Sequence, residues 1–227
     1  MVIGNGLIAK RFSSYSDDDR FLIFASGVAN SKSTDQAEYQ REFELLLRKT
    51  QENPEKTIVY FSTCSINDPA ENTSAYVAHK KKIESYLQSN MQHFLIFRVS
   101  NLVGHSSNVN TVLNFIVNNI NEGKQFDLWM NAKRNLIDVD DFFAIVDHIL
   151  QNTLFTNRII NIANPINYTV PLIVSATSNH LGKAANYKEV AKGGSFDIDI
   201  SDINPFFVQL NINFNEAYLA NLLHKYY

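Results

Sequence analysis

The sequence predicts an α/β fold, in which helices cover both faces of a parallel sheet. Short apolar runs alternate along the chain with longer segments of helical pattern, as is typical of parallel sheets. The runs are continuously apolar, which is expected of strands that are buried on both faces. The predicted strands are residues 1–4, 20–25, 57–61, 94–97 and 158–162, with shorter pieces at 126–130 and 136–138.

The predicted helices lie between these strands, and two of them have clear start signals. Thr34 or Asp35 is expected to cap a helix over about 35–50, and Asp140 or Asp141 to start another that ends near residue 151. The other helices are expected near residues 6–13, 75–90, 108–121 and 171–181 and from about 215. From about residue 165 the pattern loosens. We therefore expect a main domain of residues 1–165 and a small α/β cap, residues 166–227, that does not fold alone.

Composition limits the classes of function. The 227 residues are 45% hydrophobic and 19% charged, which indicates a globular chain with a sizeable core. A net charge of -3 gives no reason to expect nucleic acid as a partner. The single cysteine, Cys64, excludes an intrachain disulfide and fits a reducing cytoplasm. We expect no signal peptide, no membrane span and no metal site, because no apolar run or ligand spacing suggests one.

A hydroxyl, a phenol and an ammonium follow one another between residues 63 and 80. Thr63 ends a predicted strand, and Tyr76 and Lys80 are four residues apart, so they share one face of a helix. A lysine there is expected to lower the pKa of the phenol, because it favours the phenolate. The sequence therefore predicts a proton-transfer site, although Ser62 and Ser65 compete with Thr63 for the role of the hydroxyl. The alternative is a tyrosine packed on the core beside a solvated lysine.

The other candidate residues also follow predicted strands. Gly4-Asn5-Gly6-Leu7-Ile8-Ala9 forms a G-x-G-x-x-A pattern that enters a helix, as in turns that approach a pyrophosphate. Ser26 and the segment from Arg98 to Asn101 also stand at strand ends. Because ligands of parallel sheets bind beyond the carboxyl ends of strands, we expect all of these residues to converge on one site.

At this point the sequence resembles the extended short-chain dehydrogenases/reductases, the NAD-dependent epimerase/dehydratase group that acts on nucleotide sugars. The segments that carry the resemblance are the glycine pattern, Phe24-Ala25-Ser26-Gly27, Phe61 to Ile66, Tyr76-x-x-x-Lys80, Arg98 to Gly104, Arg134 to Asp141, and Asn161-Ile162-Ala163. Together they span most of the chain. The resemblance implies a Rossmann-like sheet, NAD or NADP as cofactor, and a homodimer formed through the helices near 35–50 and 75–90.

The resemblance also implies roles for individual residues. Tyr76, Lys80 and Thr63 would be catalytic: Tyr76 exchanges a proton with the sugar, Lys80 lowers its pKa and binds the nicotinamide ribose, and Thr63 donates to the substrate oxygen. The cofactor would be lined by Gly4, Asn5, Gly6, Leu7, Ile8, Ser26, Gly27, Tyr76, Lys80 and Val99. The nucleotide sugar would meet Thr63, Cys64, Asn101 and Arg134, the last of these through its phosphates.

The chain departs from the family pattern in two places. Two strand–helix units that usually follow the glycine turn are missing, and only Ser13 to Asp19 stand in that gap. This reduces the strand number and removes the strands that hold the adenosine half of the cofactor. In addition, Cys64-Ser65 stands where the family's dehydratases have an Asp-Glu pair, which argues against 4,6-dehydration. An epimerase or a reductase therefore remains, with a non-catalytic sugar-nucleotide binder or regulator as the alternative.

Overall fold

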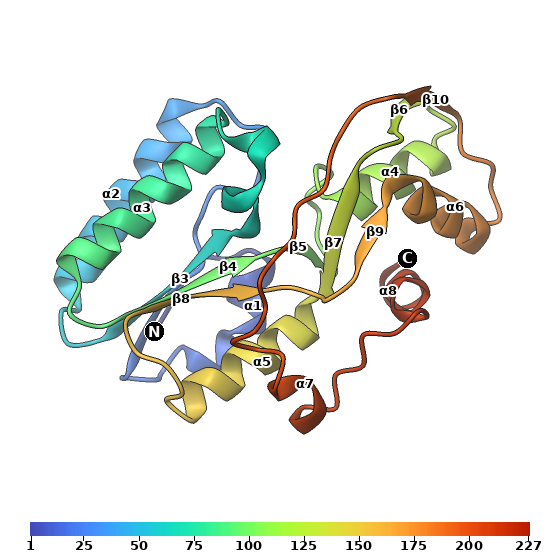
Figure 1. Ribbon diagram of the computed structural model, residues 1–227. Helices are drawn as coiled ribbons and strands as arrows, with labels where there is room; N and C mark the ends of the chain where they lie inside the picture. Colours follow the sequence, from blue (N-terminus) through green and yellow to red (C-terminus); the bar gives the residue numbers. More distant parts are fainter.

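A computed structural model describes residues 1–227 and confirms the parallel sheet (Figure 1). The sheet has five strands, which are hydrogen-bonded in the order β1-β2-β3-β4-β8. Every neighbouring pair is parallel. The bounds are β1 Val2–Ile3, β2 Phe21–Phe24, β3 Thr57–Thr63, β4 Phe94–Val99 and β8 Arg158–Ile162.

Helices cover both faces of this sheet, as predicted. Figure 1 shows α2 (Gln36–Glu52) and α3 (Ala75–Asn90) together on one face and α5 (Val139–Gln151) on the other. The short helix α1 (Leu7–Arg11) packs against α5. Alternate residues of β2 separate the two cores: Phe21 and Ile23 pack toward α5, and Leu22 and Phe24 pack toward α2 and α3. All four of these side chains are buried, which explains the uninterrupted apolar run.

The first connection of the sheet has the opposite hand to the two that follow it. The connections from β1 to β2, from β2 to β3 and from β3 to β4 all step in the same direction across the sheet. However, α1 lies on the face of α5, whereas α2 and α3 lie on the other face. Such crossovers are right-handed in about 98% of cases. The β1-α1-β2 unit therefore has the uncommon hand, as does the long connection from β4 to β8 that returns through α5. The chain thus leaves β1 and β2 toward opposite faces, which is the divergence of connections where ligands bind in open α/β sheets.

Side-chain caps explain the starts of four of the eight α-helices, and one predicted start was wrong. Asp35 caps α2 by accepting from the backbone N–H of Ala37, as predicted. Helix α5 begins at Val139 rather than at Asp140 or Asp141, because Asp138 is its N-cap and accepts from the N–H of Asp140. Several acidic residues in a row offered equal candidates for this cap, and only the strand end selects among them.

A second group of elements forms a cap beside the carboxyl ends of the strands (Figure 1). It contains a sheet of β5 (Asn101–Val103), β7 (Lys133–Asp138) and β9 (Asn167–Thr169), and a pair made by β6 (Phe126–Trp129) and β10 (Tyr187–Val190). Its helices are α4 (Val112–Asn121), α6 (Val170–Leu181) and α8 (Tyr218–Tyr226), and the short α7 (Phe206–Gln209) precedes α8. One buried cluster joins Val103, Leu113 and Leu136 with residues of α6 and α8. The core of the cap is therefore drawn from both sides of residue 165.

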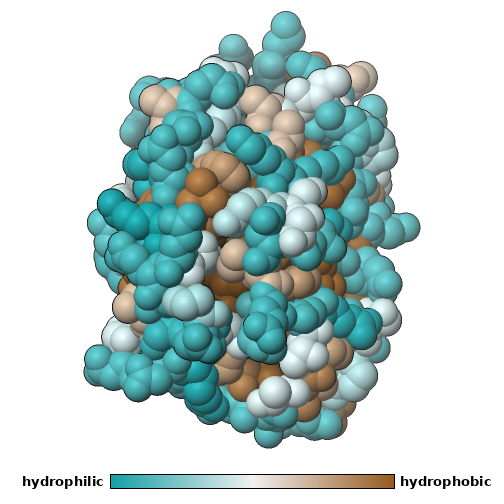
Figure 2. All heavy atoms as spheres, turned by 90° about the vertical axis from the view of Figure 1, so that its left-hand side faces the viewer, coloured by the Kyte–Doolittle hydropathy of each residue, from teal (hydrophilic) through white to brown (hydrophobic).

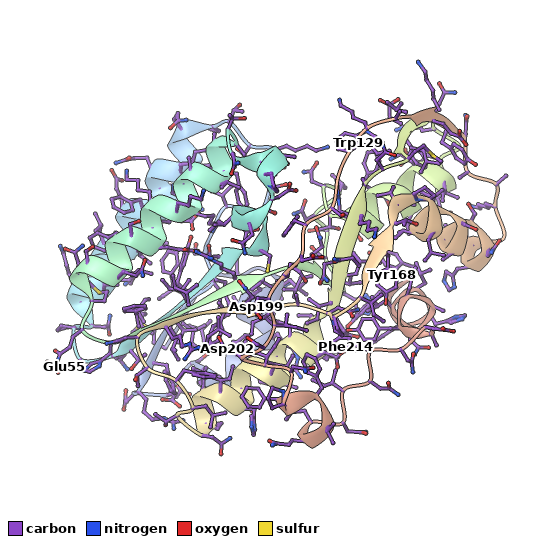
Figure 3. All side chains as sticks on the ribbon, viewed as in Figure 1. Glu55, Trp129, Tyr168, Asp199, Asp202 and Phe214 are labelled. Atoms are coloured by element: carbon purple, nitrogen blue, oxygen red, sulfur yellow. The ribbon has the colours of Figure 1, made fainter.

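Helix α8 connects the cap to the main sheet through polar contacts. The Tyr218 hydroxyl donates to Asp141 at 2.6 Å, and the Tyr226 hydroxyl donates to Asp138 at 2.7 Å. Lys225 bridges Asp138 and Asp140 at 2.7 and 2.8 Å. In Figure 3, Tyr168 and Phe214 lie on either side of α8, and Asp199 and Asp202 belong to the segment that passes alongside β8. The acidic start of α5 is thus the anchor of the C-terminal helix.

The side of the molecule that faces left in Figure 1 is mostly hydrophilic. Figure 2 shows this side with hydrophobic residues only in small, separate patches. No helix of the structure has both the length and the apolar character that crossing a membrane requires.

The two glycines of the first turn differ in what they require, and this gives a test of the fold. Gly4 has φ +129°, and a Cβ there would lie 2.3 Å from the carbonyl oxygen of Ala25. We expect Gly4→Ala to lower the free energy of unfolding by about 2 kcal/mol or more, because backbone strain adds to a clash. Gly6→Ala is the matched control, since its Cβ would meet nothing within 4 Å, and it should change stability by less than about 1 kcal/mol. Urea denaturation measures both, and equal effects would contradict the close approach of β1 to β2.

Candidate active site

Thr63, Tyr76 and Lys80 meet at the carboxyl end of β3. After Thr63 the chain makes two 3-10 turns, Cys64–Asn67 and Pro69–Glu71, and then α3 begins behind the Ser74 cap. The hydroxyl of Thr63 accepts from the N–H of Ser65 at 3.1 Å and contacts the phenol of Tyr76. The Lys80 ammonium lies 5.7 Å from the centre of the Tyr76 ring. By contrast, the hydroxyl of Ser62 is buried without a hydrogen-bond partner.

The ammonium of Lys80 is buried and paired with a carboxylate. Its Nζ donates to Glu42 Oε1 at 2.9 Å and to the Tyr60 hydroxyl at 2.8 Å. The residues of this ion pair are 2% exposed for Lys80 and 0% exposed for Glu42. The prediction placed Lys80 beside Tyr76 but gave it no partner, and the structure supplies one from α2.

Glu42 is the centre of a network that reaches four elements. Its carboxylate accepts from the backbone N–H of Val28 at 2.7 Å and from the hydroxyl of Tyr60 at 2.7 Å, and it lies 3.1 Å from His79 Nε2. Burial by itself would raise the pKa of the Glu42 carboxyl. The charge of Lys80 and the hydrogen bonds from His79 and Val28 outweigh burial, so the pKa of Glu42 lies well below its ordinary value. Glu42 is therefore a carboxylate throughout the physiological range.

This network changes the expected behaviour of the Tyr76 phenol. Burial raises its pKa, and the contacts with Lys80 and Thr63 lower it. The Glu42 carboxylate raises it again, and the net shift is upward from the ordinary value near 10. Lys80 acts in the predicted direction and lowers the pKa of Tyr76, but burial and the Glu42 carboxylate, which the sequence did not reveal, outweigh it. Tyr76 is thus a neutral phenol near pH 7.

The glycine turn and the end of β2 are in contact with this group. A Cβ on Gly4 would lie 3.1 Å from the backbone nitrogen of Ser26. A Cβ on Gly27 would lie 2.9 Å from Lys80 Nζ and 3.1 Å from Glu42 Oε1, so the backbone of Gly27 covers the ion pair. Arg41 of α2 donates to the Ser26 carbonyl at 3.1 Å. The structure therefore brings Gly4 against Ser26 and Gly27 against Lys80.

The remaining residues predicted to line the cofactor differ in exposure. Val99 pairs with Thr63 in the sheet and is buried. Leu7 and Ile8 are half-buried and pack against the core, whereas Asn5 and Gly6 are exposed. The structure therefore leaves the Asn5-Gly6 part of the turn open to solvent.

Cys64 is a buried neutral thiol. Its Sγ donates to the carbonyl of Arg98 at 3.1 Å, and burial raises its pKa to about 12. Such a thiol is a poor nucleophile, as the sequence predicted.

Asn101 and Arg134 lie on neighbouring strands of the cap. Asn101 is exposed, and its amide donates to the Asn135 carbonyl at 2.8 Å. Arg134 is half-buried and forms no ion pair; its guanidinium lies 5.9 Å from the Trp129 ring and donates to the Lys133 carbonyl. Burial lowers the pKa of Arg134 while the charges of Asp68 and Glu71 raise it, so Arg134 faces the turn that follows Thr63. Figure 3 shows Trp129 on the upper part of the cap, on the side of α3.

Sequence reasoning missed Glu42 and Tyr60. Glu42 stands on the buried face of α2, between Tyr39 and Leu46, and Tyr60 lies inside an apolar strand. A carboxylate in the middle of a hydrophobic stripe is the signal that could have been followed, because such a group needs a buried partner.

The sheet, the glycine turn at its first strand and the Tyr-x-x-x-Lys helix together define the fold of the short-chain dehydrogenases/reductases. The chain belongs to the NAD dependent epimerase/dehydratase family, whose sequence profile matches residues 44–163. The matched range includes Thr63, Tyr76, Lys80, Asn101 and Arg134 and begins after the glycine turn. A sequence search of curated proteins finds no match.

Solved structures share the fold over almost the whole chain. The dTDP-glucose 4,6-dehydratase of Bacillus anthracis, in complex with NAD, has a TM-score of 0.69 and 16% identity over 96% of this chain and 75% of its own. The UDP-glucuronic acid 4-epimerase of Bacillus cereus, with UDP-glucuronic acid and NAD, has a TM-score of 0.72 and 14% identity over 95% and 76%. RMD from Pseudomonas aeruginosa, complexed with NADPH, has a TM-score of 0.72 and 11% identity over 99% and 97%. At these identities the likeness concerns the fold.

The ion pair of Glu42 and Lys80 predicts a specific dependence of stability on pH. The pKa of Glu42 is lowered on folding, so its contribution is complete above the unfolded value near 4.3 and is lost as the pH falls below it. Glu42→Gln should lower the free energy of unfolding at pH 7 by about 3 to 5 kcal/mol, because Lys80 is left buried and unpaired. The difference between the two proteins should shrink between pH 5 and pH 3. Denaturant unfolding at each pH measures it.

Glu44→Gln is the matched control for this prediction. Glu44 lies on the same helix, is exposed and contacts Gln40. We expect its substitution to change stability by less than about 0.5 kcal/mol and to leave the pH profile as in the wild type. A Glu42→Gln protein as stable as the wild type at pH 7 would contradict the role given to the pair.

Proposed function

We propose that this chain is an NAD(P)-dependent nucleotide-sugar epimerase or reductase with Tyr76 as its acid/base. The observation that carries the proposal is the meeting of Thr63, Tyr76 and Lys80 at the carboxyl end of β3, with the Thr63 hydroxyl against the Tyr76 phenol. Membership of the epimerase/dehydratase family supports the same reading. The neighbours that hold NAD, NADPH or UDP-sugars supply the class of cofactor and substrate.

The residues present suit the reactive half of a nicotinamide dinucleotide. Gly4 and Gly27 both stand where a Cβ would collide, which leaves bare backbone at the ends of β1 and β2. Gly4, Gly6, Ser26 and Gly27 would hold the cofactor beside Tyr76, and Val99 and Lys80 would border it. When bound, the cofactor would supply or accept the hydride. The adenosine half has less support, because β1 is the edge strand of the sheet.

In this proposal Tyr76 moves a proton to or from one oxygen of the sugar. Thr63 donates a hydrogen bond to the same oxygen and so orients it toward the phenol. Glu42 and Tyr60 hold Lys80, so its ammonium stays in place next to the phenol. Cys64 and Ser65 provide no acid/base pair, so an elimination of water is not proposed.

Arg134 and Asn101 are proposed to hold the nucleotide part of the substrate. The guanidinium of Arg134 has no carboxylate partner and faces the turn that follows Thr63. A guanidinium of this kind suits the bidentate binding of a diphosphate.

A second candidate function is the binding of a sugar nucleotide without a cofactor. Two observations favour it: β1 has no strand on its outer side, and the lysine that would bind the cofactor's ribose is already engaged by Glu42 and covered by Gly27. In that case the chain would sense or present a sugar nucleotide.

Two further proposals concern organisation. We propose that residues 166–227 do not fold alone, because they share the core of the cap with residues such as Val103, Leu113 and Leu136 of the first 165. We also propose a homodimer through α2 and α3, for which the separate hydrophobic patches of Figure 2 leave only a modest interface. A sedimentation experiment that finds a monomer at high micromolar concentration would remove the dimer.

Cofactor titration separates the two candidate functions. We expect NAD or NADP to bind with a dissociation constant below 1 mM, measured by calorimetry with and without UDP or dTDP sugars. Tyr76→Phe should keep this affinity within about two-fold and reduce turnover by about 10²-fold or more, because only the transferable proton is lost.

The control is Tyr86→Phe, which makes the same change on the same helix. Tyr86 packs against Phe43, away from Thr63, and its substitution should leave turnover unchanged. If neither dinucleotide binds even with a sugar nucleotide present, the enzyme proposal fails and the binder remains. Comparable turnover in Tyr76→Phe would remove Tyr76 as the acid/base.

The nucleotide site has its own test. Arg134→Met should weaken the binding of UDP by about 10- to 100-fold, which is the loss expected for hydrogen bonds to a charged group. Arg48→Met is the control, since Arg48 is an exposed arginine of α2. Calorimetry with UDP alone measures both, and equal affinity in the Arg134 variant would place the phosphates elsewhere.

A further inference from the structure

Lys80 keeps only one of its three N–H donors free. Two are directed to Glu42 Oε1 and to the Tyr60 hydroxyl, and the carboxylate also neutralises the charge that Tyr76 would otherwise experience. We propose that Glu42 is a positioning residue that compensates Lys80 and so keeps Tyr76 a proton donor, which suits the site to a sugar nucleotide that arrives as a carbonyl. This inference rests on the proposed function and chooses a direction for it.

The geometry places Glu42 where it can act on Lys80 and Tyr76 together. The carboxylate is held by the N–H of Val28, by Tyr60 and by His79, so it cannot turn away from Lys80. The backbone of Gly27 packs directly against the ion pair, because a Cβ there would collide with both groups. The lysine is therefore fixed in a neutral ion pair next to the phenol.

The charged and titratable groups that act on the phenol or on its neighbours come from α2, β3, α3 and β4, where β4 supplies Arg98, which pairs with Glu84 at 2.6 Å. α2 contributes Glu42 and Tyr39, with Glu38 beyond Tyr39, and β3 contributes Tyr60. α3 contributes Lys80, and also His79 and Glu84, which face Glu42 and Tyr60 respectively. Lys80 is the only cation that acts on Tyr76, and the Glu42 carboxylate opposes it.

A protonated Tyr76 favours one direction of chemistry. Tyr76 would give its phenol proton to the carbonyl oxygen and would later take a proton back from solvent. A reduced nicotinamide, when bound, would supply the hydride to the carbonyl carbon and would leave oxidised, so that the carbonyl would become an alcohol. Oxidation of a sugar hydroxyl would instead need the phenolate at the start. The substrate is therefore expected from a preceding reaction that forms a keto sugar.

The alternative is that Glu42 only stabilises the core. If Glu42 is only structural, replacing it should destabilise the fold. The pKa of Tyr76 should then not depend on whether Glu42 balances the charge of Lys80. The experiment therefore measures the ionisation of Tyr76 directly and without cofactor or substrate.

The probe is ¹³Cζ-labelled tyrosine observed by NMR from pH 7 to 12, with Tyr76→Phe used to assign the signal. In the wild type we expect the Tyr76 midpoint to lie above about 10, the ordinary value. Glu42→Gln should lower the midpoint by about one pH unit or more, because Lys80 then acts on the phenol uncompensated. Adding Lys80→Met should raise it again, since the cation is gone. Glu44→Gln should leave it unchanged.

Each outcome decides the inference. A wild-type midpoint below about 10 would overturn it without any Glu42 variant, even if Glu42→Gln does not fold. A Glu42→Gln midpoint like that of the wild type would also overturn it. A low midpoint that stays low after Lys80→Met would show a loosened core and reduce Glu42 to a structural residue. The expected titration in a protein that binds no dinucleotide would retain the role of Glu42 and reject the proposed function.

Discussion

The buried ion pair of Glu42 and Lys80 is the constraint on which the rest of the site depends. It joins α2 to α3 over the sheet, takes a hydrogen bond from Tyr60 of β3, and holds the chain after β2 through the N–H of Val28. Removing two charges from water is costly, and well-packed apolar residues often stabilise a core equally well. The pair therefore does more for the arrangement of groups than for stability. Four elements can keep these contacts only in one relative position.

The close approach of β2 to its neighbours follows from the same arrangement. Gly4 brings β1 against the carbonyl of Ala25, and Gly27 brings the next turn onto the ion pair. These contacts fix the ends of β1 and β2 beside Lys80 although β1 is short and lies at the edge. The rare hand of the first connection has a related effect. It sends α1 and α2 to opposite faces of the sheet although the strands that usually flank β1 are missing.

The main sheet could be predicted because its strands are buried on both faces, and a run such as Phe21–Phe24 has no other simple explanation. The helix that begins behind Asp35 was also accessible, because a cap is a local signal. The strands β5, β9 and β10 were not predicted: they are short, partly exposed and stabilised by partners far away in sequence. The hand of the first crossover has no local signature at all, since it depends on which face α1 reaches.

The same limit explains the electrostatics of the site. Spacing shows that Lys80 stands one turn from Tyr76, and from these two residues alone the phenolate is favoured. The sign of the outcome is set by a carboxylate 38 residues earlier and by burial, neither of which the Tyr-x-x-x-Lys pattern contains. The motif therefore identifies the groups that exchange the proton but not their protonation state before the reaction. The protonation state of Tyr76 depends on the charge that the fold places next to Lys80, and in this chain that charge is the carboxylate of Glu42.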